Sequence, residues 1–172
     1  LLLGESYVYL NRFSDAMQEL DAVINLETNL DFKDEAMYWK AEIYFRTRDF
    51  EKARELYNTI LTDFPKSNYR PYVKYAYAWS LYEEKKYQES IGKFSAFVYE
   101  YPASELKEDS ELKIGEMFYR LKKYNESIEK LSMFIQGAKD VKKAKLAYFY
   151  IGEDYYYQNN YKDALTSFKK SL

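Results

Sequence analysis

The sequence repeats with a period of 37 residues, and this period constrains the fold more than any other feature. Residues of one kind recur at that spacing in four columns. The aromatic column contains Phe13, Phe50, Tyr87, Tyr124 and Tyr161. The first small column contains Gly4, Ala41, Ala78, Gly115 and Gly152. The second small column contains Ala16, Ala53, Ser90, Ser127 and Ala164. The large apolar column contains Leu20, Tyr57, Phe94, Leu131 and Phe168. A constant period in the thirties indicates stacked supersecondary units, each burying its apolar face against its neighbours.

Each copy reads as two antiparallel helices, most clearly from Tyr75 to Pro102. Apolar residues recur there at steps of three and four, which is the helical period, and alternation with period two is absent. Pro102 ends the second helix, because proline disfavours the α region for the residue before it. The sequence therefore predicts an all-α, right-handed stack of ten helices without strands. Helix boundaries are expected near residues 48–50, 85–87 and 122–124.

The five copies are expected at 1–29, 30–66, 67–103, 104–140 and 141–172, in one continuous domain spanning 1–172. A turn is expected at 28–31, where Asn and Asp favour turns and caps. Asp34 and Glu35 should begin a helix, where their charges complement its dipole. Gly137 is expected at a helix C-cap with positive φ. The chain begins and ends within predicted helices, so we expect it to be part of a longer protein.

The small column predicts close approach of the two helices in a pair, because a larger side chain would overpack the contact. The combined pattern of small, aromatic and proline residues resembles the tetratricopeptide repeat. It is clearest in one copy, as Ala41, Tyr44, Phe50, Ala53, Tyr57 and Pro65. The resemblance covers nearly the whole chain and implies a superhelical solenoid of helix pairs. The period is about three residues longer than the typical one, and the usual Trp near the start of the first helix is missing.

The extra length falls in junctions of the form aromatic-Pro-x-Ser, at 64–67 and 101–104. These junctions resemble the repeats of bacterial cell-envelope proteins, which include the lipoprotein of the outer-membrane barrel-assembly machinery and the coordinator associated with the Tol-Pal system. This resemblance implies a periplasmic or cell-envelope location rather than a cytoplasmic one.

Composition excludes several function classes. Histidine and cysteine are absent, which removes imidazole and thiolate metal sites, disulfides and His-dependent triads. No glycine-rich phosphate loop occurs among five glycines. The formal charge of −2 argues against nucleic-acid binding, and no apolar run is long enough to span a membrane. We therefore expect no catalytic residue, no metal, no cofactor and no direct membrane insertion.

The candidate binding surface is the inner face of the first helices. If the chain resembles the family, three rows face a concave groove: an acidic row with aromatic rows on both sides. The acidic row occupies Glu5, Glu42, Trp79, Glu116 and Glu153. One aromatic row occupies Leu1, Tyr38, Tyr75, Leu112 and Phe149, and the other occupies Val8, Phe45, Tyr82, Tyr119 and Tyr156. The alternative interpretation is that the aromatic residues only pack and the glutamates are only solvated. Against it, 21 tyrosines exceed what packing requires, and tyrosine suits recognition surfaces.

The sequence favours a non-enzymatic scaffold for protein–protein interaction in a bacterial envelope or motility (flagellar) assembly. Its groove would take a basic and apolar segment of another protein, with Trp79 near the centre and the glutamates more exposed. Two alternatives stay open: a helical-repeat RNA-binding protein, which the acidic row opposes, and a helical protein that binds or processes carbohydrate. We also expect self-association through the uncapped terminal helices, since Leu165, Phe168 and Leu172 lie on the last one.

Overall fold

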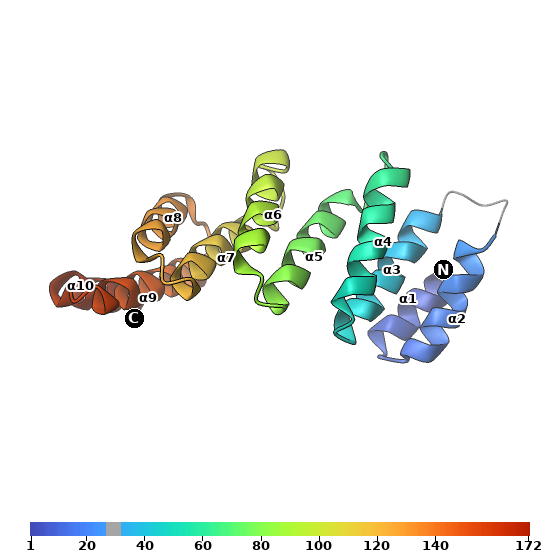
Figure 1. Cartoon of the computed structure of the whole chain (residues 1–172), viewed down its shortest axis with the longest axis horizontal. Coiled ribbons are helices and arrows are strands. Elements are labelled where there is room, and N and C mark those ends of the chain that lie inside the picture. Colours follow the sequence, from blue (N-terminus) through green and yellow to red (C-terminus); the bar gives the residue numbers. More distant parts are fainter. Residues whose placement is uncertain (27–31) are drawn as a thin grey trace. The chain divides into compact units, whose positions relative to one another are not determined.

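The computed structural model describes residues 1–26 and 32–172, which form ten α-helices and no strand (Figure 1). They divide into two compact units, Leu1–Glu84 and Lys85–Leu172. The first unit contains α1 (Leu2–Tyr9), α2 (Phe13–Ile24), α3 (Lys33–Arg46), α4 (Phe50–Asp63) and α5 (Arg70–Glu83). The second contains α6 (Tyr87–Glu100), α7 (Lys107–Arg120), α8 (Tyr124–Gly137), α9 (Val141–Tyr157) and α10 (Tyr161–Ser171). The all-α prediction and the three predicted boundaries are confirmed, while the turn predicted at 28–31 lies outside the described residues.

Prolines end the helices where the sequence predicted. The helix α4 stops at Asp63 with Phe64 as its cap, and α6 stops at Glu100 with Tyr101 as its cap, so each cap directly precedes a proline. The two junctions then fold alike. The backbone N–H of Ser67 donates to the carbonyl of Phe64, and that of Ser104 donates to the carbonyl of Tyr101, both at 3.0 Å. The aromatic-Pro-x-Ser sequence is therefore a repeated turn that ends one copy.

A left-handed residue follows the first helix of each pair. These residues have φ between 57° and 65° and are again 37 positions apart: Asn11, Arg48, Lys85, Lys122 and Asn159. After α3, the N–H of Asp49 donates to the carbonyl of Tyr44 at 2.8 Å and the N–H of Arg48 donates to that of Phe45 at 3.0 Å. This is the Schellman motif, which satisfies the last carbonyls of a helix.

The prediction of a positive φ at Gly137 is wrong, since no glycine among the described residues has one. Gly137 is the last residue of α8, and Ala138 continues in an extended conformation at φ −65° and ψ 129°. The extended backbone leads directly to Asp140, whose carboxylate caps α9 by accepting from the N–H of Lys142 at 2.8 Å. No left-handed residue is needed at this join.

The first small column and the large apolar column meet inside three helix pairs, α1/α2, α7/α8 and α9/α10. The sequence predicted the close approach of the two helices but placed the large apolar column between neighbouring pairs. A Cβ added to Gly115 on α7 would lie 2.3 Å from Leu131 Cδ2 on α8. One added to Gly152 on α9 would lie 2.5 Å from the Phe168 ring on α10. Real Cβ atoms do not approach other atoms so closely. The glycines therefore let the large residue of the second helix pack directly on the backbone of the first.

Candidate functional site

In the first unit, most of the predicted groove residues come from α3 and α5, and the others from α1 and its N-cap. On α5, Trp79 contacts the Tyr75 ring at 6.1 Å and the Tyr82 ring at 5.1 Å, both in edge-to-face geometry. Their positions follow from α-helical spacing, because residues three and four apart lie on one face. The structure thus brings together the three aromatic residues that the sequence assigned to this helix, and all three are partly buried.

On α3, the predicted residues Tyr38 and Glu42 make contacts with side chains of their own unit. Glu42 Oε1 accepts a 2.8 Å hydrogen bond from the hydroxyl of Tyr57, a buried residue of α4. Burial raises the pKa of Glu42, with the Tyr57 hydroxyl and the charge of Arg46 acting in the opposite direction. Tyr38 packs on the Tyr69 ring at 4.9 Å, and burial followed by the Glu42 charge raises its pKa. Glu42 is therefore committed to a hydrogen bond inside its own helix pair.

Two further residues that the sequence assigned to the groove in this unit, Phe45 and Val8, also have neighbours. Phe45 contacts the Phe50 ring at 5.4 Å in edge-to-face geometry. Val8, at the same column position on α1, is completely buried. Val8 therefore belongs to the core rather than to a binding surface, because α1 is packed against α2 and α3 there.

In the second unit, Glu116 contradicts the prediction of an exposed acidic row. Its side chain is only 3% exposed and lies between two cations of its own helix. Glu116 Oε2 accepts from Lys113 Nζ at 2.5 Å, and Oε1 accepts from Arg120 Nε at 2.7 Å. The spacings of three and four residues place both cations on the same face of α7. Glu116 is thus a neutralised, buried charge. Leu112, in the aromatic row, is also buried at 7% exposure.

Glu153 is the acidic-row residue that keeps access to solvent in this unit. Its side chain is partly exposed on α9, and Oε2 accepts a 3.2 Å hydrogen bond from the hydroxyl of Tyr119 on α7. Burial and the Glu153 charge raise the pKa of Tyr119. This bond connects two of the predicted rows across neighbouring helix pairs.

Around Glu153, exposed aromatic rings form a continuous surface, here named the tyrosine patch. The ring contacts run from Tyr119 to Tyr157 at 6.3 Å, from Tyr157 to Tyr124 at 5.7 Å with nearly parallel planes, and from Tyr157 to Tyr156 at 5.9 Å. Tyr161 extends the patch from Tyr156 at 5.6 Å. Tyr156, Tyr157 and Tyr161 are each more than half exposed. Large amphipathic rings that are held by one another yet open to solvent are typical of recognition surfaces.

Phe149 lies one row away from the patch on α9. Its side chain is 43% exposed, and its ring contacts Tyr150 and Phe168, each at 5.9 Å. Leu165 is exposed on α10, as is Leu172 directly after its end, and Phe168 packs onto Gly152 of α9.

Sequence reasoning missed two features of this unit. Tyr157 connects the patch, but its column holds Tyr9, Arg46, Glu83 and Arg120 in the other copies and so gave no consistent aromatic signal. Asp154 is completely buried, and neither carboxylate oxygen has a hydrogen-bond partner. Burial raises the pKa of Asp154 to about 7; the nearby Ser127 hydroxyl acts in the opposite direction and the charge of Glu153 adds to the rise. The Ser127 hydroxyl itself donates to the carbonyl of Gly115 at 3.1 Å.

Among the described residues, no group of three acidic side chains is placed to hold a metal ion. Within the same residues, no helix combines the length and apolar character of a membrane span.

Helix pairs repeated every 37 residues, with a glycine facing a large residue inside three of the pairs, define a helical-repeat protein. The sequence matches the tetratricopeptide repeat family over residues 1–68 and again over residues 72–104, which together are more than half of the chain. The chain therefore belongs to the tetratricopeptide repeat family. The comparison with curated protein sequences gives no match.

Solved structures of similar fold cover 98% of this chain at low sequence identity. A crystal structure of MamA superposes with a TM-score of 0.78 at 18% identity, over 92% of its own chain. YrrB, described as a TPR protein with an unusual peptide-binding site, gives 0.74 at 15% identity, over 80% of its chain. Repeats of a putative kinesin light chain from Podospora anserina give 0.74 at 12% identity, over 90% of that chain. These similarities confirm the helical-solenoid fold.

Proposed function

We propose that this chain is a non-enzymatic scaffold that binds a segment of a partner protein on the first-helix faces, in a bacterial envelope or motility assembly. The tyrosine patch carries the proposal. Three of its five rings are more than half exposed, and each ring is held in place by contact with another. Aromatic side chains at the centre of an interface dominate binding energy, and a rigid ring loses little entropy when it becomes ordered.

The partner segment is apolar and basic. Apolar side chains of the partner would cover the rings of the patch, and a lysine or arginine would reach Glu153, whose carboxylate is partly exposed and uses one oxygen for Tyr119. Glu116 contributes no net attraction, because Lys113 and Arg120 neutralise it. The electrostatic contribution therefore comes from fewer carboxylates than the sequence suggests. The peptide-binding site described for YrrB supports a protein partner for this fold.

The cellular setting is proposed from the repeated aromatic-Pro-x-Ser junctions and their resemblance to envelope repeats. Fractionation of the native organism, with detection by an antibody, tests this part separately. Recovery with the envelope or the motility apparatus is expected, and recovery solely with soluble cytoplasmic proteins would contradict it.

Selection from a library of random short displayed peptides tests the binding function. Peptides that bind the chain should combine lysine or arginine with large apolar residues. Tyr157→Ala should weaken their binding at least tenfold by calorimetry, on the order of what one interface aromatic contributes. Tyr99→Ala is the matched control, because Tyr99 is 89% exposed on α6 and lies outside the patch. If both substitutions have equal effects, the patch is not the binding surface.

A further inference from the structure

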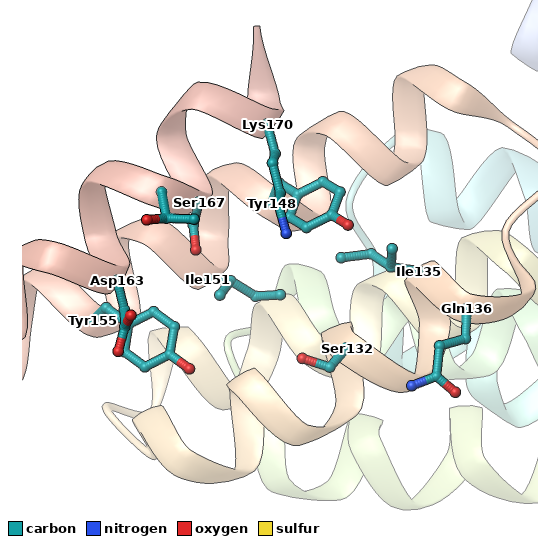
Figure 2. Close-up of a pocket in the computed structure, with 10 residues that line it drawn as sticks. Ser132, Ile135, Gln136, Tyr148, Ile151, Tyr155, Asp163, Ser167 and Lys170 are labelled. Atoms are coloured by element: carbon teal, nitrogen blue, oxygen red, sulfur yellow. The ribbon is translucent and has the colours of Figure 1, made fainter.

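The second unit carries two pockets of almost the same size, each lined by two successive second helices of the repeat and the first helix between them. The first, of about 360 Å³, is formed by α8, α9 and α10 (Figure 2). The other, of about 330 Å³, is formed by α6, α7 and α8. Most of their lining positions correspond after a shift of 37 residues. Examples of such pairs are Ser95 and Ser132, Val98 and Ile135, Ile114 and Ile151, Phe118 and Tyr155, and Met133 and Lys170. The two pockets are therefore the same feature of the repeat in successive copies.

The two copies of this pocket differ in chemistry. The α6–α8 pocket, here named the apolar pocket, is lined mainly by aliphatic and aromatic side chains, among them Phe118 and the 60% exposed Met133. Its charges already have partners, since Lys130 pairs with Glu129 at 2.9 Å and Glu111 pairs with Lys107 at 3.5 Å. An apolar side chain of a ligand is the group that this pocket favours.

The α8–α10 pocket, here named the polar pocket, has charged residues toward its two ends and Ile151 between them (Figure 2). At one end, Lys170 Nζ lies 5.2 Å from the centre of the Tyr148 ring. No carboxylate lies within ion-pair distance of Lys170 in the part of the chain that the structure describes. At the other end, Asp163 is already engaged, because its Oδ2 accepts from Asn160 Nδ2 at 2.7 Å within the cap of α10.

Further hydrogen-bond donors line the polar pocket. Gln136 and Ser132 line it from α8, and Tyr148 lines it from α9 (Figure 2). Together with the Lys170 ammonium they offer donors to a carboxylate, and charge-assisted bonds of that kind are stronger than neutral ones. The polar pocket therefore favours an acidic side chain.

We propose that these two pockets bind one extended segment of a partner protein, with an acidic residue in the polar pocket and a large apolar residue in the apolar pocket. Equivalent lining residues of the two pockets lie on α7 and α9, which contact each other. Packed helices lie about 8–10 Å apart, and an extended chain advances about 3.3 Å per residue. Residues about three positions apart can thus occupy the two pockets. This surface selects the opposite charge from the first-helix face, so the chain engages two kinds of segment at once.

Capped synthetic peptides with a glutamate and a leucine about three residues apart in a Gly/Ser background are the probe. Their binding to the 172-residue chain is measured by NMR titration and by calorimetry. Amide shifts on α8 and α10 are expected, and replacing the glutamate by lysine should abolish them. Lys170→Glu should weaken the glutamate peptide at least tenfold and strengthen the lysine peptide. Lys169→Glu, the same charge change one residue away and outside the pocket, should alter binding less than twofold.

Three results would overturn the inference: equal effects of Lys170→Glu and Lys169→Glu, shifts confined to the tyrosine patch, or no binding by any peptide of the series. A sedimentation experiment in which Lys170→Glu abolishes self-association would also overturn it, because the pocket would then hold a second copy. Tyr157→Ala should leave the glutamate peptide unaffected. The two proposed surfaces can therefore fail independently.

Discussion

Two glycines of the second unit should respond in opposite ways to the same substitution. Gly92 and Gly115 both lie inside α-helices, α6 and α7. Alanine is favoured over glycine in a helix interior by about 1 kcal/mol, so each Gly→Ala change begins with that gain. A Cβ at Gly92 has no heavy atom within 4 Å, and Gly92→Ala should therefore stabilise the chain by about 0.5–1 kcal/mol.

At Gly115 the gain is offset by overpacking. The new Cβ would lie 2.3 Å from Cδ2 and 2.5 Å from Cγ of Leu131, which is completely buried. Rotating the end of the leucine moves Cδ2 but leaves Cγ in place, so the helices must separate. Overpacking of this kind costs about 1–3 kcal/mol. The net effect of Gly115→Ala is a destabilisation of about 0–2 kcal/mol, and its difference from Gly92→Ala equals the overpacking cost.

Urea unfolding followed by circular dichroism measures both changes, with the slope m expected to stay constant. The double variant Gly115→Ala/Leu131→Ala isolates the cause. Leu131→Ala alone should cost about 2–5 kcal/mol, and the double variant should cost at least about 1 kcal/mol less than the sum of the single effects. If Gly115→Ala stabilises as much as Gly92→Ala, the reason given for the small column is wrong.

Four other substitutions test features of the turns and the buried polar groups. Burial raises the pKa of Asp154 above its unfolded value, so its contribution to stability is present at acid pH and is lost as pH rises through about 7. Between about pH 5 and about pH 8, the free energy of unfolding should therefore fall by an amount on the order of 2 kcal/mol, and Asp154→Met should remove this fall. If the urea midpoints of the variant follow the same pH profile as those of the unchanged chain, this explanation is wrong. Lys122→Gly should stabilise the chain by about 1 kcal/mol because Lys122 has φ 58°, whereas Asn159→Gly should gain only a few tenths; equal gains would show that the strain lies elsewhere. Tyr57→Phe should raise the pKa of Glu42 further by removing its hydroxyl donor, and an NMR titration without such a rise would exclude the bond.

The positions of the helices could be predicted because volume complementarity imposes periodic residue types. A large side chain cannot fit at position 115, and a small side chain at position 131 would leave a void. Such a constraint recurs in each copy and is visible in the sequence. The left-handed turns were not predicted, because Arg48 and Lys122 occupy positions where glycine is the usual signal. The packing on both sides fixes the turn in spite of the local cost.

Asp154 had a signal in the sequence that the four repeat columns do not include. Its column holds Ser6, Ile43, Ser80 and Met117 in the preceding copies, and all but the exposed Ser6 are buried. An aspartate in a buried column places an ionisable group in an apolar environment. Such a group either has a shifted pKa or has a polar partner. The ion pairs of Glu116 were also visible as cations three residues before it and four after it on one helix.

The acidic row shows why membership in a column does not determine electrostatics. Glu42, Glu116 and Glu153 occupy one column position, yet their carboxylates have three different environments. One accepts from a buried tyrosine of the next helix, one is enclosed by two cations of its own helix, and one accepts from a tyrosine of the preceding helix pair. The repeat fixes the backbone position of each glutamate. The residues in neighbouring columns vary between copies, and they determine which groups the carboxylate contacts. The copies therefore present different charges on this face, although their backbones repeat.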